Sequence, residues 1–398
     1  MSAVGVEPAV HTRSEERRAM GVACGAHALH DGYTDLIYVM LPVWQAEFGL
    51  SYAAIGLLRA MFAGTMAGFQ IPAGRLSERL GVPMVLAAGT ALAGLGYCLA
   101  PLVGSYPALI AILLISGLGA STQHPLGSAL VARAFAGARS LGALGTYNFA
   151  GDLGKMALPA AASLLLVLMP WRGALALLGT LGLAAALAIL LLTPRYGAEV
   201  VPPADAAAPI DANGKPARGG FPVLLSIGVI DSATRMGLLT FLPFLLTAKG
   251  AALPTIGLAL TLVFLGGAFG KLACAWIGAR IGVVATVWLT EGFTALGILA
   301  LLPLPLEFAL VLLPAIGVAL NGTSSVLYGS VPRLVAPEAR TRAFSVFYTG
   351  TIGSGAIAPI FYGVIGDALG VPFTLVVVAL LVLVTLPLVL VIRRQVVA

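Results

Sequence analysis

The sequence contains few charged residues. Asp, Glu, Lys and Arg make up 10% of the 398 residues, whereas 59% of the residues are hydrophobic. A soluble domain carries about 25% charged residues, so this chain cannot cover a water-facing surface with charge. The composition excludes an ordinary soluble globular protein and is typical of a membrane protein.

Cysteine is also scarce. Cys24, Cys98 and Cys274 each lie inside an apolar segment, so we expect small buried side chains rather than a disulfide framework. The first 20 residues are polar and charged, unlike a cleavable signal peptide. The net charge of +6 would suggest a nucleic-acid partner in a soluble protein. Here the basic residues lie mostly between apolar runs, and we expect no nucleic-acid partner.

Long apolar runs, in contrast, are abundant. A run of about 20 apolar residues is long enough to span a bilayer as a helix, and we identify twelve. They cover residues 21–44, 52–75, 82–101, 106–133, 140–168, 172–193, 221–247, 254–278, 283–303, 308–332, 341–365 and 371–392. The sequence therefore predicts an all-α membrane protein with twelve transmembrane helices.

The connection between the sixth and seventh runs divides the chain. Residues 194–220 are polar and rich in Pro and Ala, which is typical of a linker. We predict a tail at 1–20, a six-helix half at 21–193, a linker at 194–220 and a second six-helix half at 221–398.

The basic residues predict the orientation. If both termini are cytoplasmic, the outside loops hold Arg172 and Lys249, and 16 of the 22 Lys and Arg residues lie inside. These sixteen are Arg13, Arg17, Arg18, Arg75, Arg79, Arg133, Arg139, Arg195, Lys215, Arg218, Arg280, Arg333, Arg340, Arg342, Arg393 and Arg394. Because loops rich in Lys and Arg stay in the cytoplasm, we place both termini there. We predict a monomeric multi-pass protein of the inner (cytoplasmic) membrane.

The two halves resemble each other in sequence. Residues 34–58 align with residues 234–260, and Pro42 matches Pro243 at an offset of 201. The tripeptide RLG at 79–81 matches RIG at 280–282, at the same offset. Two parallel six-helix repeats predict a substrate site near the membrane midplane, between the halves.

The repeat, the twelve spans and one loop resemble the major facilitator superfamily of transporters. The loop reads GRLSERLG and is similar to the superfamily's signature loop, although Glu78 stands where Asp is usual and the trailing basic pair is absent. The resemblance implies that Gly74, Glu78, Arg79 and Gly81 form a gating loop that helps to close the cytoplasmic side. A charged turn that merely fixes topology is the alternative.

Two stretches resemble the fosmidomycin-resistance group of exporters within this superfamily. They are residues 27–58, which open with HALHDGYTD, and residues 117–159, which contain a His-Pro pair. His30 stands where the group carries Asn, and Leu126 stands where it carries an acid. The resemblance implies efflux of a drug-like compound by antiport, with a cargo that could differ from that of the group.

Ionisable residues in the first span are the candidates for proton coupling. His27, Asp31 and Asp35 are spaced i, i+4, i+8 and share one helix face, which His30 flanks. Ionisable groups inside spans are usually functional, and embedded carboxyl and imidazole groups can titrate near neutral pH. A structural hydrogen-bond network is one alternative. A metal site is another, but no cysteine or third histidine lies in register, so we predict neither a metal nor a cofactor.

Embedded polar residues in other spans are the candidates for substrate binding. Asn148, Asp152 and Lys155 share one face of the fifth span, where Asp152 and Lys155 could neutralise each other or line a polar cavity. Asp231 and Arg235, in the seventh span, could pair or face the charges of the first span. The candidates are His124, Asn148, Asp152, Lys155, Asp231, Arg235, Arg59 and Asn321.

For Arg59 and two other embedded charges, a structural role is an alternative to a functional one. Arg59 could reach the headgroups or line the outer mouth of the cavity, and Lys271 could extend toward the cytoplasmic surface. The resemblance implies that Glu291 faces lipid or packs at the periphery.

The sequence therefore predicts a proton-coupled secondary active transporter that works by alternating access. We expect it to export a small polar, anionic or amphiphilic compound, with protons and the lipid bilayer as its other partners. An uptake symporter for an organic anion is the alternative, and a metal-ion transporter is less favoured. A membrane enzyme lacks support because we find no nucleophile motif, phosphate-binding loop or metal-spaced set. A receptor would favour a longer soluble domain than these short polar segments provide.

Overall fold

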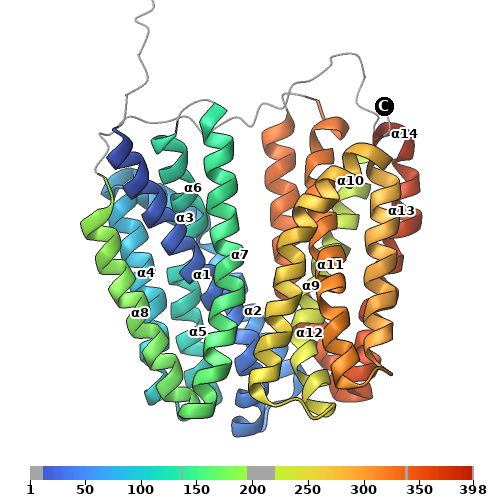
Figure 1. Cartoon of the computed structure of the whole chain (residues 1–398), viewed down its shortest axis with the longest axis horizontal. Helices are drawn as coiled ribbons and strands as arrows, with labels where there is room; N and C mark the ends of the chain where they lie inside the picture. Colours follow the sequence, from blue (N-terminus) through green and yellow to red (C-terminus); the bar gives the residue numbers. More distant parts are fainter. Residues whose placement is uncertain (1–11, 136–137, 195–219, 337–338, 397–398) are drawn as a thin grey trace, which may run out of the picture.

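The computed structural model describes residues 12–135, 138–194, 220–336 and 339–396, and within these ranges the chain is helical and has no strand (Figure 1). Residues 1–11 of the predicted tail lie outside the described residues. So does the predicted linker, apart from its two end residues.

The first half of the chain comprises helices α1 to α8 and one short 3₁₀ turn, η1. Their bounds are α1 Arg13–Phe48, α2 Tyr52–Gly68, α3 Gln70–Leu80, α4 Val82–Cys98, η1 Ala100–Leu102, α5 Tyr106–Ala120, α6 Gln123–Ala134, α7 Ala138–Leu168 and α8 Trp171–Leu192. The second half comprises α9 to α14. Their bounds are α9 Gly220–Ala248, α10 Leu253–Leu301, α11 Leu306–Leu334, α12 Arg340–Leu383, α13 Thr385–Val391 and α14 Arg393–Val396.

Several predicted spans are bent or joined. The span predicted at 52–75 is divided into α2 and α3, which meet at an angle of 42°. Non-helical backbone at Gly282 (φ 82°, ψ 167°) and Gly370 (φ 83°, ψ 162°) interrupts α10 and α12 between pairs of predicted spans. Glycine adopts positive φ without a steric penalty, so these two residues can turn the chain between helices.

Nine helices of the described residues are long and apolar enough to cross a membrane, or ten if α2 and α3 form one bent span. Helix α1, which buries Asp31 and Asp35, is not among the nine. The last of the nine covers Arg342–Val391 and includes the break at Gly370.

The backbone repeats at the offset seen in the sequence. Gly49 follows α1 with φ 60° and Gly250 follows α9 with φ 87°, while Gly81 and Gly282 have φ 85° and 82°. Both pairs are separated by 201 residues. Equivalent turns therefore stand at equivalent positions of the two halves, as the sequence repeat leads us to expect.

Small residues let α1 and α7 approach closely. A Cβ atom added to Gly154 would collide with the backbone carbonyl of Ala28. Close backbone contact at glycine is a common way to pack membrane helices. It brings the polar face of α7 against the polar face of α1.

The hydrophobic core shows where the halves meet. Its largest cluster combines both halves and includes Trp44, Phe62 and Phe241. Two smaller clusters belong to one half each, one with Val22 and one with Leu224. The halves thus pack together at one end and have separate cores at the other, the end where α1 begins and α14 finishes (Figure 1).

Candidate functional site

A cavity of about 610 Å³ lies between the two halves. It is lined by α1, α2, α6 and α7 of the first half and by α9 to α12 of the second. Eleven of the twelve predicted proton-coupling and substrate-binding residues line it. They are His27, Asp31, Asp35, Arg59, His124, Asn148, Asp152, Lys155, Asp231, Arg235 and Asn321.

Asp31 is the centre of a charged cluster in the first half. Its Oδ2 atom lies 3.3 Å from His27 Nε2 and 3.3 Å from Lys155 Nζ. Its Oδ1 atom lies 3.7 Å from His124 Nε2. Three helices therefore direct a nitrogen-bearing side chain at one buried carboxylate.

The orientation of His27 fixes the position of one proton. Its Nδ1 atom lies 2.8 Å from the carbonyl oxygen of Tyr147, and its ring stacks on the Tyr147 ring with centroids 4.1 Å apart. A carbonyl can only accept, so His27 Nδ1 carries a hydrogen and Nε2 faces Asp31. A hydrogen bond between Nε2 and Asp31 then requires a further proton on one of the two groups.

Lys271 and Asp152 join the two halves across the cavity. Lys271 Nζ, on α10, donates to Asp152 Oδ1 at 2.6 Å and to Oδ2 at 2.8 Å, on α7. Lys155 lies closer to Asp31 than to Asp152, whose Oδ1 atom is 3.9 Å away. Asp152 and Lys155 are therefore not a simple isolated pair, and Lys271 points into the cavity rather than toward the membrane surface.

Arg59 and Asp35 belong to the same wall of the cavity. Arg59 is 3% exposed, and its guanidinium carbon lies 4.8 Å from the centre of the Tyr38 ring. Asp35 is buried on α1, one turn after Asp31. Arg59 thus lines the cavity and does not extend to the headgroups.

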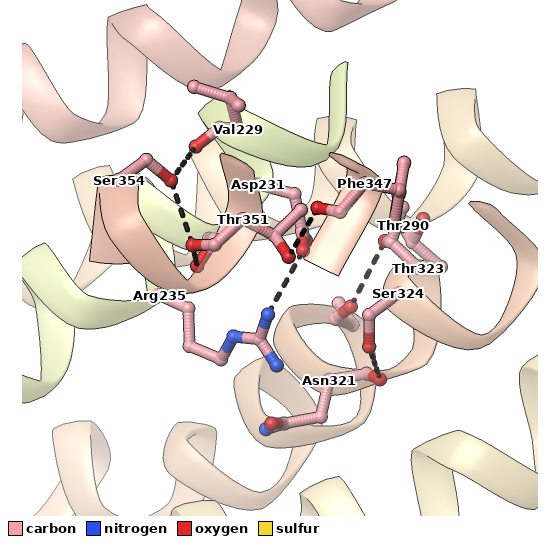
Figure 2. A network of polar contacts seen from close by, with 12 residues as sticks. Val229, Asp231, Arg235, Thr290, Asn321, Thr323, Ser324, Phe347, Thr351 and Ser354 are labelled. Carbon is pink, nitrogen blue, oxygen red and sulfur yellow. Dashed lines mark hydrogen bonds and ion pairs between the residues drawn. The ribbon is translucent and has the colours of Figure 1, made fainter. Parts of the chain in front are cut away.

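The second half carries a separate charged cluster on α9. Arg235 Nη2 donates to Asp231 Oδ2 at 3.2 Å, and Figure 2 shows the guanidinium directed at that carboxylate. Glu291, on α10, is 1% exposed and lies close enough to Asp231 to interact with it. Of the two expected placements, Glu291 therefore does not face lipid. It is packed inside the second half and is absent from the cavity lining.

Aromatic residues of the second half also line the cavity, and no pattern in the sequence distinguishes them from core residues. Tyr328 of α11 and Tyr348 of α12 have ring centroids 4.8 Å apart, and Phe347 lies beside them. Asn321 lines the cavity as expected, while its Nδ2 atom donates to the carbonyl of Gly317 at 3.2 Å.

His30 and the predicted gating residues lie away from the cavity. His30 Nε2 is 2.9 Å from Thr90 Oγ1, and His30 is absent from the cavity lining. Gly74, Glu78 and Arg79 are helical residues of α3 rather than part of a loop, and Gly81 follows the helix. Glu78 and Arg79 are exposed.

The first cluster also contains a possible set of metal ligands. His27, Asp31 and His124 offer one ligand atom each, all within 4.8 Å of one another. His124, on α6, supplies the third ligand that helical spacing in α1 lacks. However, the Lys155 ammonium already contacts Asp31, and a bound cation would have to displace it. The cluster is therefore a poor fit for a metal ion.

Comparison with known proteins gives one family. The sequence profile of the Major Facilitator Superfamily matches residues 23–228 and again 223–397. The fosmidomycin resistance protein of Escherichia coli K12 is 28% identical over 147 residues, 37% of this chain and 36% of that protein. A probable L-galactonate transporter of the same organism is 25% identical over 139 residues, 35% of this chain and 31% of that protein. The matched segments thus span about a third of each relative.

A solved structure shares the fold over nearly the whole chain. It is a bacterial homologue of the human lysosomal transporter Spinster, captured in an inward-facing and unoccupied conformation. The TM-score is 0.82 at 15% identity, covering 97% of this chain and 98% of that one. With the profile matching each half of the sequence, the chain belongs to the Major Facilitator Superfamily, whose members are multi-pass membrane transporters rather than enzymes.

Proposed function

We propose that this protein is a proton-coupled secondary transporter that works by alternating access and exports a small polar, anionic or amphiphilic compound. One observation carries the proposal. A cavity between the halves contains a buried carboxylate, Asp31, that contacts two imidazoles and the Lys155 ammonium. Binding sites of such transporters lie between the repeats, near the midplane.

The proposed topology has twelve spans with both termini in the cytoplasm. Helix α1 is the first span, α2 with α3 the second, and α5 with α6 the fourth. Helix α10 supplies two spans on either side of Gly282, and α12 with the helices after it supplies two on either side of Gly370. The excess of basic residues in the predicted inside segments supports this orientation. The cavity would then open to the cytoplasm of the inner membrane.

The contacts of Asp31 suggest how a proton could be exchanged for cargo. When Asp31 is ionised, it holds Lys155 by charge attraction at 3.3 Å. Protonation removes that attraction and leaves the Lys155 ammonium available to an anionic or polar cargo group. It also lowers the cost of enclosing the carboxyl when the cavity is sealed from water. Asp35, one turn further along α1, is the second candidate for this role.

Export is tested with the protein in proteoliposomes under an imposed pH gradient. The name of the fosmidomycin resistance protein makes fosmidomycin the first probe. We expect a pH gradient to drive accumulation of the probe against its concentration gradient. The combined Asp31→Asn and Asp35→Asn variant should abolish the effect, whereas the exposed control Glu307→Gln should retain it. Unchanged accumulation by the combined variant would mean that protons are not coupled through α1.

An uptake symporter for an organic anion is the second candidate. The similarity to a probable L-galactonate transporter and the cationic groups of Lys155, Lys271 and Arg235 in the cavity favour it. With galactonate as the probe, the sign of its flux under an inward proton gradient separates the two functions. Movement of galactonate in the same direction as the protons indicates symport. Movement in the opposite direction indicates export by antiport.

A further inference from the structure

A second pair of acidic groups lies in the second half, partly behind the cavity wall. Asp231 lines the cavity, whereas Glu291 does not. Both are buried, with 3% and 1% of their surfaces exposed. The Glu291 carboxyl lies close enough to Asp231 and to Thr323 to interact with both. Figure 2 shows Thr323 beside Thr290, and their hydroxyl oxygens lie 2.6 Å apart.

The charge around this pair does not balance if both carboxyls are ionised. The charged groups that act on the pair are Asp231 and Arg235 of α9 and Glu291 of α10, and α11 contributes the uncharged hydroxyl of Thr323. One guanidinium would then face two buried carboxylates. Neighbouring buried carboxylates cannot both ionise easily, and such pairs hold one proton between them.

The unpartnered oxygen of Glu291 leads to the same conclusion. An ionised carboxylate only accepts hydrogen bonds, so contact between two carboxyls as a hydrogen bond needs a proton on one of them. The Oε1 atom of Glu291 is buried and has no hydrogen-bond partner among the described residues. An unpartnered oxygen of a buried carboxylate is costly, and a proton on the pair reduces that cost.

We propose that Asp231 and Glu291 form a second proton-binding site, in which the two carboxyls share one proton. Because Asp231 alone reaches the cavity, the proton enters and leaves by way of Asp231. The Arg235 guanidinium pairs with the one negative charge that remains on the two carboxyls. The site extends the proposed proton coupling from the first half to the second, but its ability to bind a proton does not depend on coupling through Asp31.

The experiment is infrared difference spectroscopy of the purified full-length protein in lipid at neutral pH, without cargo. The C=O stretching band of protonated carboxyls is compared between the wild type, Glu291→Gln and Asp231→Asn. Glu291→Gln leaves Asp231 facing Arg235 alone and should lose band intensity equivalent to one protonated carboxyl. Asp231→Asn removes the carboxyl that shares the proton with Glu291 and should remove or shift that band. Glu307→Gln removes an exposed carboxyl of the same half and should lose none.

Two outcomes are decisive. Loss of the band in folded Glu291→Gln, or its loss or shift in folded Asp231→Asn, supports the site, and either variant is sufficient if the other fails to fold. An unchanged band in a variant that elutes and unfolds like the wild type overturns it. Since no transport is measured, failure here is distinguishable from failure of the export proposal, and each can stand without the other.

Discussion

The Lys271–Asp152 pair should hold the two halves together in the conformation seen here. Its two hydrogen bonds, 2.6 and 2.8 Å long, connect α10 with α7. Further along the same two helices, Thr261 Oγ1 donates to the carbonyl of Met156 at 3.0 Å. The cavity is closed at the end where the two halves pack together. Opening it at this closed end requires α7 and α10 to separate. Replacing Lys271 with Met should therefore favour the open arrangement at that end.

The size of the effect follows from the partial burial of the pair. The Lys271 side chain is 38% exposed and the Asp152 side chain 10% exposed. Exposed pairs contribute about 0.2–1 kcal/mol, and breaking a buried pair costs about 3–5 kcal/mol. An intermediate value of about 1–3 kcal/mol shifts a two-state equilibrium about 5- to 150-fold. Lys155 remains near Asp152, so the variant does not leave an isolated buried charge.

A cysteine at the closed end provides the assay. Ser163 is 1% exposed and lies against Gly257, at the contact between α7 and α10. In a background with the three native cysteines replaced by Ala, Ser163→Cys should react slowly with a membrane-impermeant maleimide. Adding Lys271→Met should raise the reaction rate about 5- to 150-fold, because the closed end opens more often.

Lys249→Met is the matched control. Lys249 Nζ donates to the carbonyls of Leu302 and Leu304, all within the second half, so its loss should leave the rate unchanged. If Lys271→Met reacts no faster than the background protein, the pair does not stabilise the closed end. An equal increase of the maleimide reaction rate in Lys249→Met would also refute the reasoning. Lys271→Met would then act by destabilising the fold in general and not by breaking the pair.

Two further predictions concern stability. Tyr97 donates to the carbonyl of Tyr33 at 2.7 Å and is fully buried, so Tyr97→Phe should cost about 1 kcal/mol; a thermal midpoint equal to that of the wild type would contradict this. Gly154→Val should destabilise the fold by about 1–3 kcal/mol or more, because a side chain would collide with the Ala28 carbonyl. Gly353→Ala, where no atom lies within 4 Å of the added Cβ, is its control in the same thermal-unfolding measurement.

The cavity lining was largely predictable because burying charge in a membrane protein is costly. Groups such as Asp31, Asp152 and Asp231 must face other polar groups or water, so their positions on a helix indicate the interior. His30 shows the limit of this rule. It is adjacent to Asp31 in sequence but bonds to Thr90 of α4, away from the cavity. A buried imidazole can bond either to a cavity carboxylate or to a hydroxyl of a neighbouring helix, and helical spacing cannot distinguish the two.

The partners of the charged residues were not predictable. Lys155 contacts Asp31, Lys271 contacts Asp152 and Glu291 contacts Asp231. Each contact joins residues that are far apart in the sequence and lie on different helices. Spacing along a helix fixes which face a residue occupies, but the separation and rotation of neighbouring helices fix which charges meet.

Two helix breaks are marked in the sequence by a nearby proline. Each proline lies within a continuous apolar run, so the run alone predicts one unbroken span. Helix α2 ends at Gly68 and Pro72 follows four residues later, while α5 is capped by Ser121 and Pro125 follows at the same distance. Proline lacks the N–H that would bond to the carbonyl four residues earlier. Proline alone does not decide the matter, because Pro42 lies inside the unbroken α1.

The arrangement of the ion pairs bears on how the halves could move. The contacts of Asp31 with His27, His124 and Lys155 stay within the first half, and those of Asp231 with Arg235 and Glu291 stay within the second. Among the described residues, the ion pair that crosses the cavity is Lys271–Asp152. Rocking of two rigid halves would therefore leave both carboxyl clusters intact while breaking that crossing pair. Each cluster could then carry its proton through the transition, and the strength of the crossing pair would set how readily the transition occurs.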